Sequence, residues 1–96
     1  MGSSFVIEWD DDKNRRLQAE RGVSFEDVLE AIESGRILAD EAHPNAESYG
    51  QQRILVVEIG GYACVVPYVQ TGNRRLLKTI YRSRVYQKNY LSFRRP

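Results

Sequence analysis

Two apolar runs joined by a pair of glycines constrain the fold of this chain more than any other feature. Residues 53–59 and 62–69 are rich in β-branched and aromatic side chains, and Gly60–Gly61 between them can supply the positive φ angles of a tight hairpin turn. Both runs are apolar at consecutive positions, so we expect a hairpin at the centre of a sheet with cover on both faces. Pro67 cannot donate a hydrogen bond to a ladder and indicates a bulge or an edge segment.

A strand and a first helix are predicted near the start of the chain. Residues 5–9 combine aromatic and β-branched side chains, which favours a short strand, and Trp9 is expected to anchor an edge of the core. The carboxylates of Asp10–Asp12 suit the N-terminal end of a helix over residues 14–20, which Gly22 ends. Helix capping explains these aspartates better than a cation site, because no loop of alternating ligands follows them.

The next segment predicts a second helix. Ser24 and Asp27 approximate a capping box, and Gly35 ends the helix after Ser34. One apolar stripe follows the helical period between them and consists of Phe25, Val28, Leu29 and Ile32.

The remaining residues complete an α+β domain. Residues 39–52 carry turn-forming side chains without a sustained period, which predicts a long and functional loop. Residues 75–82 predict a last strand, and the aromatic, basic tail over residues 85–96 is expected to end in a short helix. The predicted order is β-α-α-β-β-β, with two N-terminal helices packed on an antiparallel sheet in one domain over residues 1–96.

Length and composition exclude several classes of protein. A chain of 96 residues is expected to form a single core. It has no apolar run near the roughly 20 residues that span a bilayer, and residues 1–4 lack the features of a secretory leader, so we expect a cytoplasmic protein with no membrane partner. Cys64 is the only cysteine, which excludes an internal disulfide and a zinc site of several thiolates; its apolar surroundings predict an inert core thiol.

The charge of the chain is divided between its two halves. Residues 1–52 hold five basic and twelve acidic side chains, a net charge of −7. Residues 53–96 hold nine basic side chains against Glu58 alone, a net charge of +8. A concentrated positive field attracts polyanions such as RNA, DNA or an acidic protein.

Basic and aromatic side chains alternate in the C-terminal half. Guanidinium groups bind phosphate through paired hydrogen bonds and tyrosine rings can stack on unpaired bases, so the pattern favours RNA. In a strand, the period of two would place Lys78, Arg82 and Arg84 on one face. The alternative is that the basic side chains solvate an outer face while the tyrosines pack. The predicted RNA-binding residues are Arg74, Arg75, Tyr81, Tyr86 and Lys88.

His43 is the only histidine, and it lies in the predicted loop. Imidazole can accept or donate a proton near neutral pH, which makes His43 a candidate for proton transfer; a solvated surface histidine is the alternative. Without a second histidine or clustered cysteines it does not support a metal site, so neither a metal nor another cofactor is expected.

Several stretches of the chain resemble the BrnT family of toxins. Residues 5–14 (Phe-Val-Ile-Glu-Trp-Asp-Asp-Asp-Lys-Asn) are similar to the Phe-Glu-Trp-Asp-x-x-Lys-like opening of that family. Residues 21–28 (Arg-Gly-Val-Ser-Phe-Glu-Asp-Val) resemble its Lys-His-Gly-Val-Ser-Phe-Glu-like helix start, with Arg21 where the family usually has histidine. The stretches His43–Gln52 and Lys78–Arg84 look like a subgroup of these small toxin-like proteins.

What the resemblance implies is a RelE-like fold and the toxin of a type II toxin–antitoxin pair, a ribonuclease that halts translation. Its partners would be RNA and a cognate ribbon-helix-helix antitoxin, and a homodimer is left open.

A metal-independent endoribonuclease is therefore the first hypothesis. The 2′-hydroxyl of RNA would attack the adjacent phosphate, and the protein would supply a proton-transfer group and cations for the developing charge. The expected catalytic residues are His43 for proton transfer and Lys78, Arg82 and Arg84 for the phosphate. Two other hypotheses stay open: a non-catalytic module whose basic sheet face binds RNA or an acidic protein, and a relic that has lost its activity.

Overall fold

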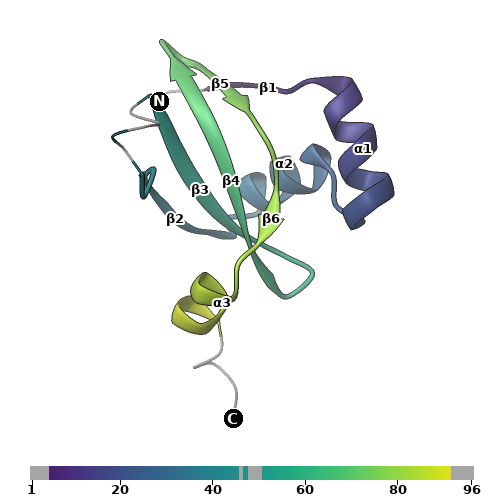
Figure 1. Cartoon of the computed structure of the whole chain (residues 1–96), viewed down its shortest axis with the longest axis vertical. Coiled ribbons are helices and arrows are strands. Elements are labelled where there is room, and N and C mark those ends of the chain that lie inside the picture. Colours follow the sequence, from purple (N-terminus) through teal and green to yellow (C-terminus); the bar gives the residue numbers. More distant parts are fainter. Residues whose placement is uncertain (1–4, 46, 48–50, 92–96) are drawn as a thin grey trace.

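The computed structural model of the protein describes residues 5–45, 47 and 51–91 (Figure 1). None of the helices in these ranges is long and apolar enough to cross a membrane. The elements are β1 (Val6–Glu8), α1 (Asp11–Arg21), α2 (Phe25–Glu33), β2 (Ile37–Ala42), β3 (Gln52–Ile59), β4 (Tyr62–Thr71), β5 (Arg74–Leu77), β6 (Tyr81–Arg82) and α3 (Arg84–Tyr90).

The predicted hairpin forms the centre of a six-stranded sheet in an α+β architecture. The strand order is β1-β5-β4-β3-β2, and β6 pairs with β4 beyond the end of β5. Gly60 and Gly61 turn between β3 and β4 with φ angles of 60° and 82°, so the prediction of a central hairpin is confirmed. β1 runs parallel to β5, and the expectation of a purely antiparallel sheet is wrong at this edge, because no hairpin turn joins these two strands and dictates their direction.

Part of the predicted loop over residues 39–52 is a strand instead. β2 pairs antiparallel with β3, with a register shift between Ile37 and Ala39. Asp40 and Glu41 are poor strand formers, but the free edge of β3 supplies backbone partners that outweigh this local preference. The loop is correspondingly shorter than the sequence predicts.

The predicted strand over residues 75–82 is interrupted opposite Pro67. Leu77 pairs with Tyr68, and Tyr81 pairs with Val65. The chain advances four residues from Leu77 to Tyr81 while β4 advances only three between their partners, so the segment between β5 and β6 contains one extra residue. Pro67 has no N–H to donate, while its carbonyl accepts a 2.8 Å hydrogen bond from the N–H of Lys78. The irregularity predicted at Pro67 is confirmed, and the single long strand is wrong.

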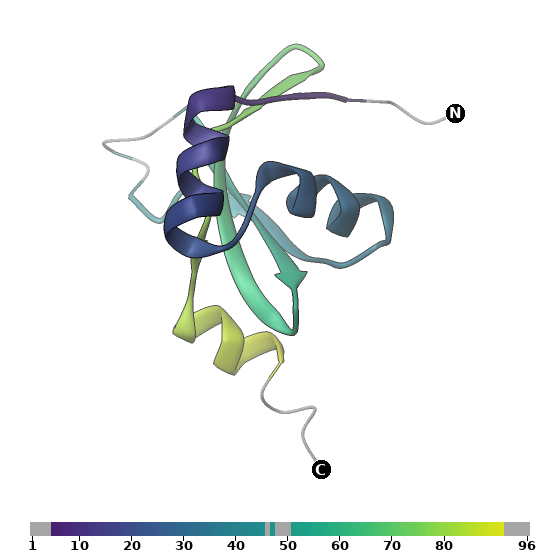
Figure 2. The same ribbon diagram turned by 90° about the vertical axis from the view of Figure 1, so that its right-hand side faces the viewer.

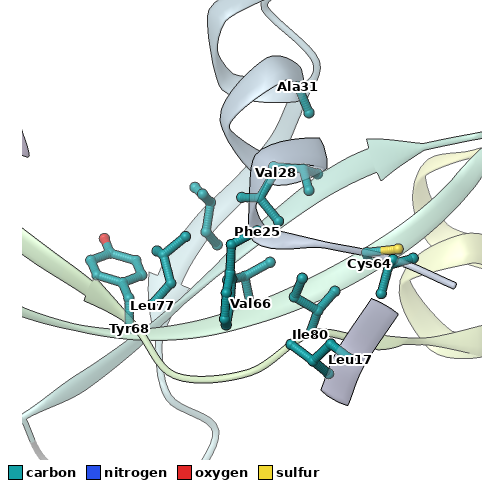
Figure 3. Close-up of a cluster of buried hydrophobic side chains, with 12 residues drawn as sticks. Leu17, Phe25, Val28, Ala31, Cys64, Val66, Tyr68, Leu77 and Ile80 are labelled. Carbon is teal, nitrogen blue, oxygen red and sulfur yellow. The ribbon is translucent and has the colours of Figure 1, made fainter. Parts of the chain in front are cut away.

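Helices cover both faces of the hairpin, as its apolar pattern predicts. On one face Phe25 of α2 and Leu17 of α1 pack in a buried cluster with side chains of β3, β4 and β5 (Figure 3). Trp9 stacks on Phe25 with 5.6 Å between ring centroids and anchors the edge of this core. On the other face a second cluster includes Leu91, the residue after α3, and Tyr86 of α3 packs against it. Figure 2 shows α3 well apart from α1 and α2.

A buried polar side chain joins the two N-terminal helices, whose caps at Asp10, Gly22 and Ser24 form as predicted. Asn14 Oδ1 accepts a 2.7 Å hydrogen bond from the N–H of Phe25, and Asn14 Nδ2 donates to Glu26 Oε1 at 2.8 Å. The bond from Asn14 is the largest influence that lowers the pKa of Glu26 below its ordinary value. The Asn14 amide therefore adds a polar attachment to the one that Leu17 makes in the core.

Candidate functional site

A cationic groove lies between α1 and the end of β5. We call it the α1 groove, and its lining residues are Asp10, Lys13, Arg16, Leu76, Leu77 and Lys78. The volume of the groove is about 260 Å³, below the roughly 300–1,000 Å³ of typical small-molecule pockets. A group of the size of a phosphate therefore suits it better than a large cofactor.

The pairing of β1 with β5 determines where this groove forms. Glu8 pairs with Leu76 in parallel, and β1 then leads the chain away from β5 into α1 (Figure 1). Residues from the first turns of α1 and from the end of β5 therefore line the same groove. Lys13 and Arg16 are three positions apart and hence neighbours on one helix face. Lys78 follows β5 at the bulge opposite Pro67 and reaches the groove from the sheet.

The positive charge of the α1 groove is not neutralised by the fold. Within the described ranges, the side chains of Lys13, Arg16 and Lys78 form no ion pair or hydrogen bond. Asp10 caps α1, its Oδ1 accepting from the N–H of Asp12 at 2.9 Å. Three cations against one carboxylate leave a net charge of +2 among the lining residues, which favours an anionic ligand.

Arg82 extends the positive charge along the neighbouring part of the sheet. Its guanidinium lies over the ring of Tyr62, 4.8 Å from the ring centroid. α1 lies alongside the segment that leads to Arg82. Its last residue, Arg21, donates a hydrogen bond to the carbonyl of Ile80, and Leu17 lies beside Ile80 in the core (Figure 3). Lys78 and Arg82 thus lie on one chain segment that borders α1.

Two predicted RNA-binding arginines form ion pairs with carboxylates of the acidic half. Arg74 forms an ion pair with Glu8 of the adjacent strand. Arg75 lies 3.8 Å from Asp40 and also 3.8 Å above the ring centroid of Phe5. Arg74 joins the paired strands β5 and β1, whereas Arg75 reaches Asp40 of β2, and neither arginine lines the α1 groove.

Sequence reasoning missed a polar cluster that joins β2, β3 and β4. Tyr68 donates from its hydroxyl to Asp40 Oδ1 at 2.7 Å, and Arg53 Nε donates to the same oxygen at 3.2 Å and to the Tyr68 hydroxyl at 3.3 Å. Burial, followed by the bond to Asp40, raises the pKa of Tyr68 above its ordinary value. The bond to Tyr68, followed by the charge of Asp40, raises the pKa of Arg53. No spacing in the sequence signals this cluster, because its members come from separate strands.

The remaining C-terminal residues lie on or near α3. Tyr86 donates to Glu41 Oε1 at 3.0 Å and stacks on Tyr90, and burial raises its pKa, so it packs as the alternative interpretation proposed. Tyr81 is exposed on β6, and Arg84 and Lys88 are exposed on α3. Arg84 begins a helix, so the prediction that it shares a strand face with Lys78 and Arg82 is wrong.

His43 does not lie with the predicted phosphate-binding residues. Its N–H donates to the carbonyl of Gln52 at 3.3 Å, and its Nδ1 accepts from the N–H of Asn45 at 3.0 Å. Gln52 pairs with Val69 on β4, whereas Arg82 pairs with Cys64 on the same strand. Five positions separate these two pairs, about 17 Å at the rise of a strand. The four predicted catalytic residues therefore do not converge on one point.

Comparisons of the chain with models of protein families, with curated proteins and with solved structures find no match. In the described part of the chain, no group of three or more His, Cys, Asp or Glu side chains could hold a metal ion. Burial raises the pKa of the Cys64 thiol, which agrees with an unreactive core cysteine. The α1 groove, with three cationic side chains around a small space, is the candidate functional site.

Proposed function

We propose that the protein is an endoribonuclease of the BrnT kind with a RelE-like fold, the toxin partner of a ribbon-helix-helix antitoxin, and that its α1 groove binds the phosphate backbone of RNA. Three unneutralised cations around a space of phosphate size carry this proposal. Asp10 and Lys13 belong to the Trp-Asp-x-x-Lys stretch on which the BrnT resemblance rests, and Lys78 belongs to the predicted catalytic set. Residues from the N-terminal stretch of the resemblance and from the predicted catalytic set thus line one groove.

The proposed reaction uses the nucleophile that RNA itself carries. The 2′-hydroxyl oxygen attacks the adjacent phosphorus while the bond from phosphorus to the 5′-oxygen breaks. The departing 5′-oxygen takes up a proton from water, which leaves a 2′,3′-cyclic phosphate and a 5′-hydroxyl. Negative charge develops on the non-bridging oxygens, where Lys78 and Arg16 stabilise it. This route needs no metal ion, because cationic side chains supply the electrostatic stabilisation.

The proton of the 2′-hydroxyl needs an acceptor close to the same phosphate. His43 follows β2, which lies on the far side of β3 and β4 from the segment of Lys78. Asp10 is the single carboxylate among the lining residues of the groove. In this proposal Asp10 takes the place of His43 as the proton acceptor.

A cleavage assay on a 5′-labelled single-stranded RNA tests the proposal. Wild type should give products that end in a cyclic phosphate, with or without chelator, and a 2′-deoxy residue at the cleaved position should abolish the cut. Lys78→Ala should lower the rate by about 10²–10³. Arg15→Ala, which removes an exposed cation of α1 that is paired with Asp12, should cleave normally. Full activity of Lys78→Ala, or no cleavage by wild type, would contradict the proposal.

A non-catalytic RNA-binding module is the second candidate, and the dispersal of the predicted catalytic residues favours it. His43 and Arg82 lie near opposite ends of β4, so no histidine is assembled with the basic side chains. Such a module would give no products in the cleavage assay. It would still bind RNA, with an affinity that falls as the salt concentration rises.

A further inference from the structure

We infer that Tyr62 and Arg82 form a stacking site for an unpaired nucleobase of single-stranded RNA. The inference rests on the proposed RNA binding at the α1 groove and adds the class of RNA that is recognised. It concerns a tyrosine that lies outside the basic segment of the sequence.

Tyr62 and Arg82 are both exposed to solvent. Tyr62 begins β4 directly after the Gly60–Gly61 turn, and 46% of its surface is exposed. Arg82 lies over its ring at 4.8 Å from the centroid. A half-exposed phenol ring with a guanidinium group over it presents an aromatic and cationic surface to solvent, and proteins stack unpaired bases on surfaces of this kind.

Arg82 keeps its charge available. Among the described residues it has no carboxylate partner. Arg75 provides the contrast, because it also lies over aromatic rings but pairs with Asp40 and donates to Gln70. The N–H groups of Arg82 can therefore bind a phosphate while its plane supports a base.

The Tyr62–Arg82 pair lies within reach of the α1 groove. Lys78 and Arg82 are four residues apart, so their Cα atoms lie at most about 14 Å from each other. A few nucleotides of one strand can reach both places. A duplex cannot use the stacking site, because its bases are already paired and stacked, so the arrangement selects single-stranded RNA.

Fluorescence anisotropy with 2′-O-methyl RNA tests this inference, since the blocked 2′-oxygen prevents cleavage during the measurement. Three labelled probes of equal length are compared: a single strand, a duplex, and a nucleobase-free ribose-phosphate strand. Wild type should bind the single strand most tightly. Tyr62→Ala should weaken binding of the single strand by roughly 5- to 150-fold, the effect of losing one stacked base, and leave the nucleobase-free strand unchanged. Tyr62→Phe keeps the ring and should bind like wild type.

Two control variants separate stacking from charge. Lys78→Ala should weaken binding of the single strand and of the nucleobase-free strand by the same factor. Phe5→Ala removes another exposed ring beneath an arginine and should change nothing. Equal affinity of Tyr62→Ala and wild type for the single strand overturns the stacking site, as does an equal loss on all probes.

The outcomes also separate this inference from the proposed function. Tyr62-dependent binding in a protein that cleaves no RNA supports the stacking site and overturns the endoribonuclease. Cleavage that is lost in Lys78→Ala, together with binding that is independent of Tyr62, supports the endoribonuclease and overturns the stacking site. Absence of binding to every probe overturns both.

Discussion

The hydroxyl of the buried Tyr68 donates a 2.7 Å hydrogen bond to Asp40 Oδ1 and thereby ties β4 to the edge strand β2 across β3. Arg53 on the intervening strand donates to both groups. Among the described residues, no buried side-chain nitrogen or oxygen lacks a hydrogen-bond partner. The cluster explains why a segment with the polar residues of β2 is held on the sheet.

Removal of the Tyr68 hydroxyl should destabilise the fold. Tyr68→Phe keeps the ring in the core but leaves Asp40 without its shortest hydrogen bond, which should lower the free energy of unfolding by about 1–2 kcal/mol. Urea denaturation followed by circular dichroism measures this. Tyr81→Phe, at a tyrosine that is 42% exposed, should leave the midpoint unchanged; equal midpoints for Tyr68→Phe and wild type would rule out a stabilising bond.

Stability should also fall at alkaline pH because of Tyr68. Burial, with the bond to Asp40, raises the pKa of this phenol above its ordinary value of 10.0. As the pH rises past about 10 the unfolded chain loses its phenolic proton before the folded chain does, so the contribution is complete below that pH and is lost above it. Urea midpoints between pH 8 and 11 should decline less steeply for Tyr68→Phe than for wild type. Parallel declines would show that another group is responsible.

Two adjacent arginines of α1 should differ in RNA binding. Arg16 lines the α1 groove, whereas Arg15 pairs with Asp12. Each phosphate contact on a single strand contributes about 0.7 to the slope of log affinity against log salt. Arg16→Ala should lower the steepness of that slope by about this amount, and Arg15→Ala should keep it. Titrations at several salt concentrations measure the slopes, and identical slopes for the two variants would remove Arg16 from the phosphate site.

The joint between α1 and α2 should depend on Asn14. Asn14→Ala removes the acceptor for the buried N–H of Phe25 and the donor to Glu26, so the free energy of unfolding should fall by about 1–3 kcal/mol. Hydrogen exchange at the Phe25 amide should accelerate in this variant. Gln18→Ala, at an exposed position of the same helix, serves as the control, and slow exchange at Phe25 in Asn14→Ala would contradict the role of the amide.

Sequence reasoning predicted the candidate site only in part. The Trp-Asp-x-x-Lys stretch places Asp10 and Lys13 at the start of one helix, and Lys78 was selected for its charge. That these residues line one groove follows from the parallel pairing of β1 with β5, which no local pattern predicts. Tyr62 was missed because it lies in an apolar strand and gains its arginine neighbour only when β6 pairs with β4.

The sequence by itself determined the elements that depend on neighbouring residues: the central hairpin at Gly60–Gly61, the capped helices, and the irregularity at Pro67. Turn geometry, capping and apolar periodicity act over a few residues, so a linear chain displays them. Only the tertiary structure decided that Asp40 meets Tyr68, that β2 is a strand, and that His43 lies away from Arg82. Those relationships depend on which distant strand edges pair, and that choice is made by the packing free energy of the whole chain.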